Sequence, residues 1–442
     1  MKRLIIICLI FNIGMFNCSP KIYSPLSNNP EAQALNNILK ETCESLYKYS
    51  YNGGFQGVID LVNGNRYGEN FNGVIPESQI WNQPPGTPFV GLAMVDAFKV
   101  THDSFYLEKA LQTAEVLIKA QLPSGGWSHH YDLESDNKEV SSTFDDNISQ
   151  SCLKFLLSVQ SEIKTNKNIN DSVDRALSFF INSQKAEGGW PQVYPPVGSF
   201  RDDYTFNDRT INDIIETLLY AYQVTNNEKY LELAEEGGSF IIKSQLQKPF
   251  AGWAQQYDEN LVPSVGRKHE MPAICSRVTR NNMMTLMNLY DHTNNRKYLR
   301  PIPDAIAWLE KAKLPSGKWA FFYDLNSTTP VFFNFKSEKF YNRSEVKDKV
   351  KNYGPEALYG IPDAIRRYNF IDNEKKVRDT RYYSIKVKNN KKMLEDYLSS
   401  RNDNGLWIRD DKLYIGDNTR NIMFITRYIS YLVQSQTNLL ED

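Results

Sequence analysis

One short motif recurs four times along this chain at almost equal spacing, and it limits the folds that the chain can adopt. Each copy has a tyrosine four residues after a tryptophan, in a loop that contains glycine. The tryptophans are Trp127, Trp190, Trp253 and Trp319, at intervals of 63, 63 and 66 residues. Each interval holds two segments with apolar residues at helical spacing, so the repeating unit is a helical hairpin. We therefore predict an all-α fold, an α/α toroid of repeated helical hairpins with the G-G-W loops at one end.

Weaker copies of the motif extend the repeat toward both ends. Gly53-Gly54-Phe55 resembles a degenerate first copy. Gly405-Leu406-Trp407 precedes a helical pattern from Ile422 to Val433 and resembles a last copy that would close the ring. Residues 36–442 are therefore predicted to form a single toroid domain. Short polar turns are predicted to end one helix and cap the next at Val100-Thr101-His102, Thr225-Asn226-Asn227 and residues 292–295.

The first residues carry a targeting pattern. Residues 1–18 have two basic residues before an apolar core and end at Cys18. This pattern predicts a secretory signal, and the terminal cysteine resembles a bacterial lipoprotein processing site. An ordinary signal peptide with an incidental cysteine is the alternative. Residues 19–35 are largely polar and are predicted to be a tether, so we expect an extracytoplasmic protein held at the membrane by a lipid on Cys18.

Composition excludes two further readings. Lys and Arg total 51 and Asp and Glu total 52, giving a net charge of −1. The chain therefore lacks the basic excess that is typical of nucleic-acid binding. The cysteines after Cys18 are Cys43, Cys152 and Cys275, an odd number without metal-like spacing, so no disulfide framework is predicted.

Acidic residues follow two of the tryptophans at matching places. Thr143-Phe144-Asp145-Asp146-Asn147 and Thr205-Phe206-Asn207-Asp208 each stand where the next helix begins. Such residues are common as helix N-caps, which is the simpler interpretation. In a closed ring, however, the loops point to one end, and Asp146 and Asp208 could converge there. Two convergent carboxylates would suit Ca²⁺.

The third loop carries basic residues where its neighbours carry acids. It contains Arg267, Lys268, Arg277 and Arg280. A solvated loop with surface charges is one interpretation, and a cleft for an anionic substrate is the other. The tryptophans are predicted to be mainly structural, with Trp190 the best candidate for substrate contact. The His129-His130 pair is interpreted as surface.

At these residues the chain resembles a known family. The strings G-G-W-P-Q, Y-P and T-F-N-D around Trp190 are similar to the signature of the family-10 pectate lyases, and Gly252-Trp253-Ala254-Gln255-Gln256 supports it. The similarity covers roughly residues 85 to 365. The resemblance implies an α/α toroid and Ca²⁺-assisted anti β-elimination of polygalacturonate. It also implies that Asp146 and Asp208 lie at the metal and the substrate carboxylate, and that Arg267 is the base.

The chain departs from the family pattern at two positions. The family usually has an arginine where this chain has Phe321, and a second arginine where this chain has Asn334-Phe335-Lys336-Ser337. Those arginines would bind uronate carboxylates, so their absence allows a different uronate polymer or a weakened enzyme. A glycoside hydrolase that uses Asp146 and Asp208, and a non-catalytic lipoprotein that binds acidic oligosaccharides, are the alternatives.

Overall fold

The computed structural model describes residues 26–68, 71, 73–135, 139–346, 356–372 and 380–439. The predicted signal segment and Cys18 lie outside the described residues. Helix α1 begins at Pro30, with the Asn29 side chain as its N-cap, so the last six residues of the predicted tether are helical. Among the described residues, no helix is long and apolar enough to cross a membrane.

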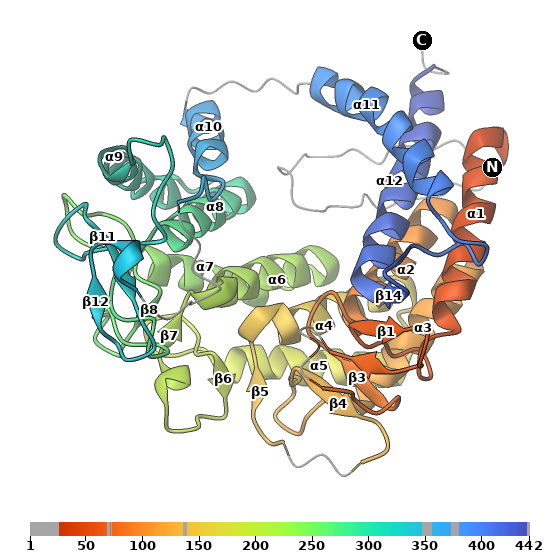
Figure 1. Ribbon diagram of the computed structural model, residues 1–442, viewed down its shortest axis with the longest axis horizontal. Helices are drawn as coiled ribbons and strands as arrows, with labels where there is room; N and C mark the ends of the chain where they lie inside the picture. The colour runs from red at the N-terminus through yellow and green to blue at the C-terminus, as the bar shows by residue number, and fades with distance from the viewer. Residues whose placement is uncertain are drawn as a thin grey trace.

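The chain forms the predicted α/α toroid (Figure 1). Inner helices contact one another in the order α12, α2, α4, α6, α8 and α10, and α3, α5 and α7 pack behind α2, α4 and α6. The helices are α1 (Pro30–Tyr47), α2 (Thr87–Thr101), α3 (Ser104–Lys119), α4 (Ile148–Glu162), α5 (Lys167–Asn182), α6 (Thr210–Thr225), α7 (Glu228–Lys243), α8 (Ser276–Thr293), α9 (Ile302–Ala312), α10 (Ile361–Asp372), α11 (Thr380–Ser399) and α12 (Ile415–Leu439).

The short turns after α2, α6 and α8 have the predicted capping chemistry. One residue adopts the left-handed conformation and ends the inner helix, and the next accepts a hydrogen bond from the start of the outer helix. The left-handed residues are His102, Asn226 and Asn294, and the capping side chains are Asp103, Asn227 and Asn295. These local signals explain why the hairpins repeat so regularly.

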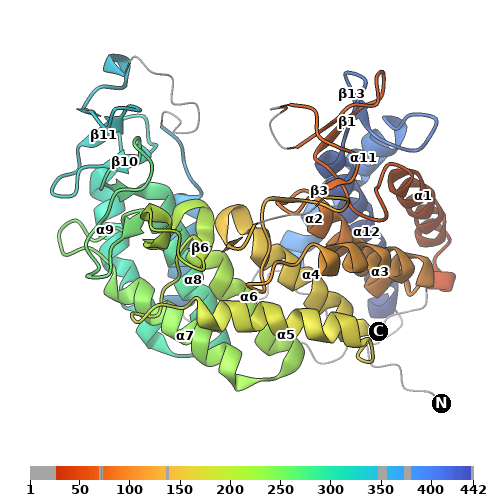
Figure 2. The ribbon, with the colours of Figure 1, turned by 90° about the horizontal axis from the view of Figure 1, so that it is seen from below.

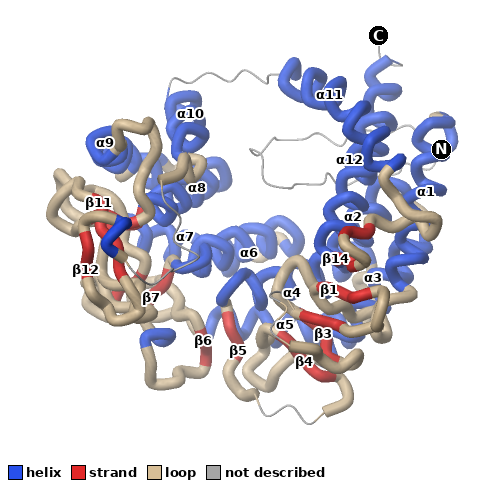
Figure 3. The backbone as a smooth tube through the Cα atoms, in the orientation of Figure 1, coloured by secondary structure: helices blue, strands red, loops and turns tan. Residues whose placement is uncertain are grey.

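Short strands join neighbouring copies at the loop end. They were not predicted, because most contain only two or three residues. Figure 2 shows the strands on one side of the helices, and Figure 3 shows how much loop accompanies them. The antiparallel pairs that link successive copies are β3 (Gln79–Trp81) with β4 (His130–Asp132), β5 (Ser142–Thr143) with β6 (Val193–Tyr194), β7 (Tyr204–Thr205) with β8 (Gln256–Tyr257), and β9 (Ile274–Cys275) with β10 (Phe322–Tyr323).

Two small sheets complete the loop end. One continues from β10 to β11 (Pro330–Phe333) and β12 (Lys339–Phe340), and the other has the order β13-β14-β1-β2. The strands of the second sheet are β1 (Val58–Asp60), β2 (Arg66–Tyr67), β13 (Ile408–Arg409) and β14 (Lys412–Tyr414). The 3-10 helices are η1 (Leu26–Asn28), η2 (Asp145–Asn147), η3 (Phe200–Asp202), η4 (Asn207–Arg209), η5 (Arg296–Leu299) and η6 (Arg343–Glu345).

Both terminal copies take part in the ring. Phe55 is fully buried, and its carbonyl accepts a hydrogen bond from the Trp81 amide, as the Trp127 carbonyl does from the Thr143 amide. The last copy pairs with the first through β14 and β1, and α12 contacts α1 and α2. In Figure 1, α10 stands apart from α11 and α12, so the described part of the ring is open on that side.

The repeated tryptophans attach each loop to the preceding outer helix through a buried ring and an indole hydrogen bond. All four side chains are at most 1% exposed. Each indole N–H donates to a backbone carbonyl 10 or 12 residues earlier in the chain, as Trp190 Nε1 does to the Phe180 oxygen at 2.9 Å. Trp407 repeats the contact with the Tyr397 oxygen at 2.8 Å, which confirms the predicted last copy.

Asp96 on α2 is a buried carboxyl among basic residues of three inner helices. Burial raises its pKa to about 7, against the opposing charges of Lys99, Arg427 and Lys154. The folded state therefore keeps a proton that the unfolded state loses as pH rises from about 4 to about 7, and folding stability falls over that window.

We expect Asp96→Asn to raise the free energy of unfolding by about 2 kcal/mol at pH 8, where the native carboxylate is charged. At pH 5 only part of that window has been crossed, so the gain should be smaller than at pH 8. Urea denaturation of both proteins at the two pH values measures the difference. Equal gains at pH 5 and pH 8 would contradict the argument.

Candidate active site

The strand pairs bring equivalent residues of successive loops into one row. The residue after each first strand donates its amide to the carbonyl two residues beyond the next tryptophan: Asn82 to His129, Phe144 to Gln192, Phe206 to Gln255 and Ser276 to Phe321. By this register, Gln83, Asp145, Asn207 and Arg277 occupy equivalent positions. The basic residue Arg277 of the third loop therefore occupies the same structural row as the acidic residue Asp145 of the first.

Asp146 and Asp208 have unusual backbone conformations. Their φ angles are 46° and 42°, in the left-handed region, and Asn147 and Arg209 after them are left-handed as well. No side-chain cap hydrogen bond forms at the start of α4 or α6. The N-cap interpretation is therefore wrong at both positions. Left-handed conformations cost free energy outside glycine, and they concentrate at functional sites.

A cluster of possible metal ligands lies at the first of these turns. Ligand atoms of His129, Asp145 and Asp146 all lie within 4.8 Å of one another. Gln83 from the previous copy donates to Asp146 Oδ2 at 3.1 Å. Asp145 Oδ1 is buried and has no hydrogen-bond partner in the described part of the chain. An unpaired buried carboxylate oxygen is costly, and a bound cation would satisfy it.

The interpretation of the His129-His130 pair as surface residues is therefore corrected for His129, which is only partly exposed and belongs to this cluster. His130 is exposed, as expected. Asp145 also belongs to the cluster, although of this adjacent pair only Asp146 was predicted to be a metal ligand. The signal that could have identified it is its position directly before Asp146 in the sequence.

Asp208 lies beyond this three-residue cluster but is electrostatically linked to it. Burial raises the pKa of Asp208, and the charge of Asp145 raises it further, while Arg277 and Arg267 oppose the rise. Arg277 Nη1 is 3.9 Å from Asp208 Oδ1. The structure thus places the acidic residue Asp208 of the second loop close to the basic residue Arg277 of the third loop.

Arg267 forms a tight ion pair with Glu270. Its Nε and Nη2 donate to the two carboxylate oxygens of Glu270 at 2.9 and 2.7 Å, and its amide donates to the same group. The Glu270 side chain is 5% exposed and the Arg267 side chain 44%. Gln255 donates to Glu270 at 3.0 Å and also to Asn207. A carboxylate that accepts two hydrogen bonds from a guanidinium stabilises its protonated form. This pairing therefore opposes a role of Arg267 as a base in this structure.

A pocket of about 450 Å³ lies along the row of loops. Acidic, basic and amide groups share its lining, including Asp145, Asn207, Arg201, Arg267 and Glu270. Opposite charges on facing walls can hold an anionic ligand on one side and a cation on the other.

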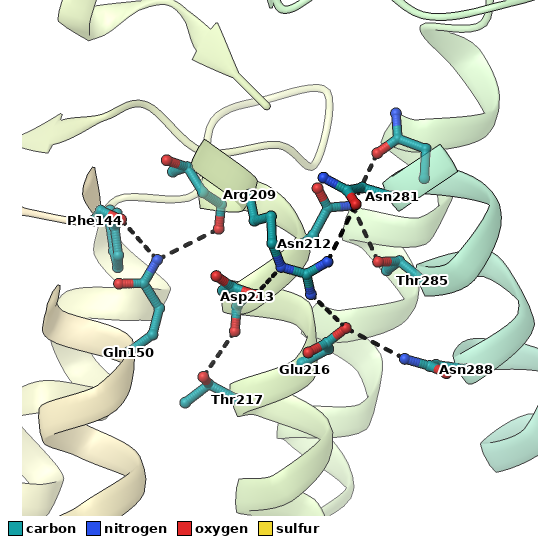
Figure 4. Close-up of polar contacts among 12 residues, drawn as sticks. Phe144, Gln150, Arg209, Asn212, Asp213, Glu216, Thr217, Asn281, Thr285 and Asn288 are labelled. Atoms are coloured by element: carbon teal, nitrogen blue, oxygen red, sulfur yellow. Dashed lines mark hydrogen bonds and ion pairs between the residues drawn. The ribbon is translucent and has the colours of Figure 1, made fainter. Parts of the chain in front are cut away.

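Beneath the second turn, a buried polar network fixes Arg209 (Figure 4). Arg209 donates to Asp213 and Glu216, each at 2.9 Å, and Asn288 donates to Glu216 at 3.3 Å. Burial alone would lower the pKa of Arg209, but the two carboxylates more than offset this and raise it. Burial raises the pKa of Asp213 to about 7 despite Arg209. The network holds the left-handed residue next to Asp208.

The other predicted cations lie at the edge of the site or below it. Lys268 is exposed on the loop after Arg267. Arg280 is partly buried and donates to Asn281 at 3.1 Å. Its Nε is buried without a hydrogen-bond partner among the described residues, and burial lowers the pKa of its guanidinium, with the charge of Arg209 adding to the effect.

Trp190 is not available to a substrate. It is 0% exposed and makes the same indole hydrogen bond as Trp127 and Trp253. The prediction of a substrate contact is wrong here, because the G-G-W turn directs the ring into the space between helices.

We expect Trp190→Phe to lower the free energy of unfolding by about 1–2 kcal/mol, since it removes a buried donor and leaves the Phe180 carbonyl with only the longer hydrogen bond from Ser183 Oγ, at 3.3 Å. Affinity for an oligosaccharide should be unchanged. Thermal denaturation and calorimetric titration measure the two quantities, and the same change at Trp253 is the matched control. A selective loss of affinity at Trp190 alone would restore the binding role.

The fold and the row of loops define an α/α toroid with a polar site at one end. The crystal structure of a D-mannose isomerase shares this fold, with 13% identity, a TM-score of 0.51 and coverage of 93% of this chain and 100% of that one. The family 10 polysaccharide lyase from Cellvibrio cellulosa shares it too, with 23% identity, a TM-score of 0.50 and coverage of 59% and 90%.

Residues 132–317 match the family model of the pectic acid lyases. A variant of the Cellvibrio cellulosa lyase in complex with trigalacturonic acid is 22% identical, with a TM-score of 0.50, and covers 59% of this chain and 92% of that one. No curated protein matches the chain in sequence. The resemblance to family-10 pectate lyases is thus confirmed over the segment that holds the site, and the family match supports a polysaccharide lyase.

Proposed function

We propose that the protein cleaves polygalacturonate or a related uronate polymer by Ca²⁺-assisted anti β-elimination. The observation that carries this proposal is the pocket whose lining combines Arg267 and Arg201 with Asp145 and Asn207, inside the segment that matches the pectic acid lyases. The basic side chains suit uronate carboxylates, and the acidic ones suit a cation that bridges protein and substrate.

The acidic residues present fit Ca²⁺. Asp146 and Asp208 would hold it with Asp145, whose buried Oδ1 has no hydrogen-bond partner among the described residues and would be satisfied by a cation. Carboxylate oxygens are the ligands that Ca²⁺ prefers, and His129 is better suited to a neighbouring hydrogen bond than to this ion. When bound to a uronate carboxylate, the ion would acidify the adjacent C5–H bond.

Arg267 would contact the sugar whose C5 proton is removed. Elimination takes the C5 proton, forms the C4–C5 double bond and expels the C4 oxygen as the leaving group. We keep Arg267 as the proposed base, with Glu270 as the residue that orients it. The role requires the ion pair to loosen when the substrate binds, because a guanidinium held by a carboxylate does not accept a proton. Arg277 and Arg280 are the alternative candidates.

The products of the reaction test the proposed class. A lyase leaves an unsaturated sugar that absorbs in the ultraviolet, whereas a glycoside hydrolase yields only new reducing ends. A non-catalytic binding protein leaves the oligosaccharide intact. A panel of uronate polymers, assayed with Ca²⁺ and with a chelator, therefore separates the three functions. Reducing ends without ultraviolet absorption would overturn the lyase proposal in favour of a hydrolase.

We expect Asp208→Asn to raise the Ca²⁺ concentration needed for half-maximal activity by at least about tenfold, because the site loses one negative charge. Calorimetric titration with Ca²⁺ alone should show the same loss without any turnover. Asp363→Asn, on the exposed surface of α10, is the control and should leave both values unchanged. Unaltered Ca²⁺ affinity in the Asp208 variant would remove this residue from the proposed cation site.

The cellular location stays a prediction. Residues 1–18 and Cys18 supply the only argument for a lipid-anchored, extracytoplasmic protein. Metabolic labelling with a fatty acid, compared between the native chain and Cys18→Ala, would test it.

A further inference from the structure

An exposed aromatic ring lies next to the side chain of His269, which is on the loop that carries Arg267 and Glu270 of the pocket. Phe335 is 48% exposed. It lies in the turn between β11 and β12, where Asn334 Oδ1 accepts hydrogen bonds from the amides of Lys336 and Glu338 at 2.9 and 3.0 Å. The turn is therefore well fixed, and it presents the ring to solvent. The ring is therefore held in place and is available for contact with a ligand.

His269 connects this ring to the pocket. The His269 and Phe335 ring centroids are 5.0 Å apart at an interplanar angle of 71°. His269 lies between Arg267 and Glu270, both of which line the pocket. Burial lowers the pKa of His269, which favours its neutral form at pH 7. Two uncharged rings thus continue the cationic wall of the pocket.

A second aromatic pair lies at the edge of the same sheet, since Phe321 directly precedes β10 and its partner Tyr359 precedes α10. Phe321, at the position equivalent to Gln192 and Gln255, packs edge-on against Tyr359 with ring centroids 5.7 Å apart. This end of the row therefore offers aromatic side chains where the preceding loops offer amides. A pyranose ring has faces of C–H groups that pack on aromatic rings. A uronate at such a position would place its carboxylate on an apolar surface without a cation, whereas an uncharged sugar carries no such cost.

We propose that Phe335 and His269 form a stacking subsite for an uncharged sugar, next to the position of the reacting uronate. This inference rests on the proposed function and narrows it: the substrate is a polymer in which uronate and neutral sugars occur in one chain. The pocket binds the uronate through its charged side chains, and the Phe335 ring binds the neutral neighbour through its face.

Calorimetric titration with two probes tests the subsite. One probe is trigalacturonic acid, and the other is a tetrasaccharide in which galacturonate alternates with rhamnose. We expect Phe335→Ala to raise the Kd for the mixed tetrasaccharide about tenfold, the effect of uncovering part of one aromatic side chain. The Kd for trigalacturonic acid should change less than about threefold. Phe335→Arg should reverse the preference between the probes, because it supplies a cation for a carboxylate.

Phe370→Ala is the matched control, since Phe370 on α10 is 46% exposed and stands outside the loop end of the ring. It should leave both Kd values unchanged. Equal changes for the two probes in Phe335→Ala, or no change in either, would overturn the stacking subsite while leaving the lyase proposal intact. A native protein that neither binds nor cleaves either probe would overturn both.

Discussion

Replacing Arg267 by alanine is expected to lower turnover of a uronate polymer by roughly 10²–10⁴-fold, the usual effect of losing a general base. The Arg267 side chain is 44% exposed, but the Glu270 carboxylate that it pairs with is 5% exposed, so the variant should fold with reduced stability, with Gln255 still donating to Glu270. It should also bind oligosaccharide with an affinity close to that of the native protein, since Arg201 still lines the pocket. The measurements are initial rates from ultraviolet absorption and Kd by calorimetry. Arg366→Ala, which removes an exposed ion pair of the same i,i+3 spacing, is the control.

The pH dependence of the native rate separates a base from an arginine that only orients the substrate. A base with a high pKa is deprotonated more often as pH rises, so the rate should increase up to tenfold per pH unit through the alkaline range. Arg267→Lys should shift that rise to lower pH, because a lysine loses its proton more readily. Near-native turnover in Arg267→Ala would move the role to Arg277 or Arg280. A flat alkaline profile in the native protein would indicate that Arg267 binds but does not take the proton.

The fold was predictable because its signals are local and repeated. The indole hydrogen bond of each Trp requires the same Gly-rich turn and the same distance from the preceding helix, so the motif recurs in the sequence. The left-handed caps at His102, Asn226 and Asn294 are equally local. The strands that join the copies were not predicted, because two or three residues are too few to display an alternating pattern.

The site was predictable only in part, because its members meet across copies. Asp146 and Asp208 follow from their matching places after the tryptophans. His129 joins Asp145 and Asp146 because the one long loop between α3 and α4 folds back on itself, and Gln83 reaches Asp146 from the previous copy. Neither approach can be read from residue spacing. The Arg267–Glu270 pair is local, since the two residues are three apart in the sequence. The burial of Trp190 was foreseeable from its likeness to the other three tryptophans, and its different neighbours misled the prediction.

Replacing Arg209 by methionine is expected to lower the free energy of unfolding by about 3 kcal/mol at pH 8. Methionine keeps most of the apolar length of the side chain but leaves Asp213 and Glu216 without the cation that they share. Their side chains are 12% and 17% exposed, so solvent replaces little of the lost interaction. The loss should shrink as pH falls toward 5, because protonated carboxyl groups need no cation and burial already raises the pKa of Asp213 to about 7.

A triple variant distinguishes a lost cation from a lost shape. Arg209→Met combined with Asp213→Leu and Glu216→Met removes every charge of the network, and replacing a whole buried ion network by apolar residues is often neutral for stability. The triple variant should therefore be more stable than Arg209→Met alone at pH 8, in urea denaturation followed by circular dichroism. If the single and triple variants are equally unstable, the role of Arg209 is to fill space and not to neutralise the acids. Its left-handed turn beside Asp208 would then depend on packing, and Ca²⁺ affinity should fall equally in both variants.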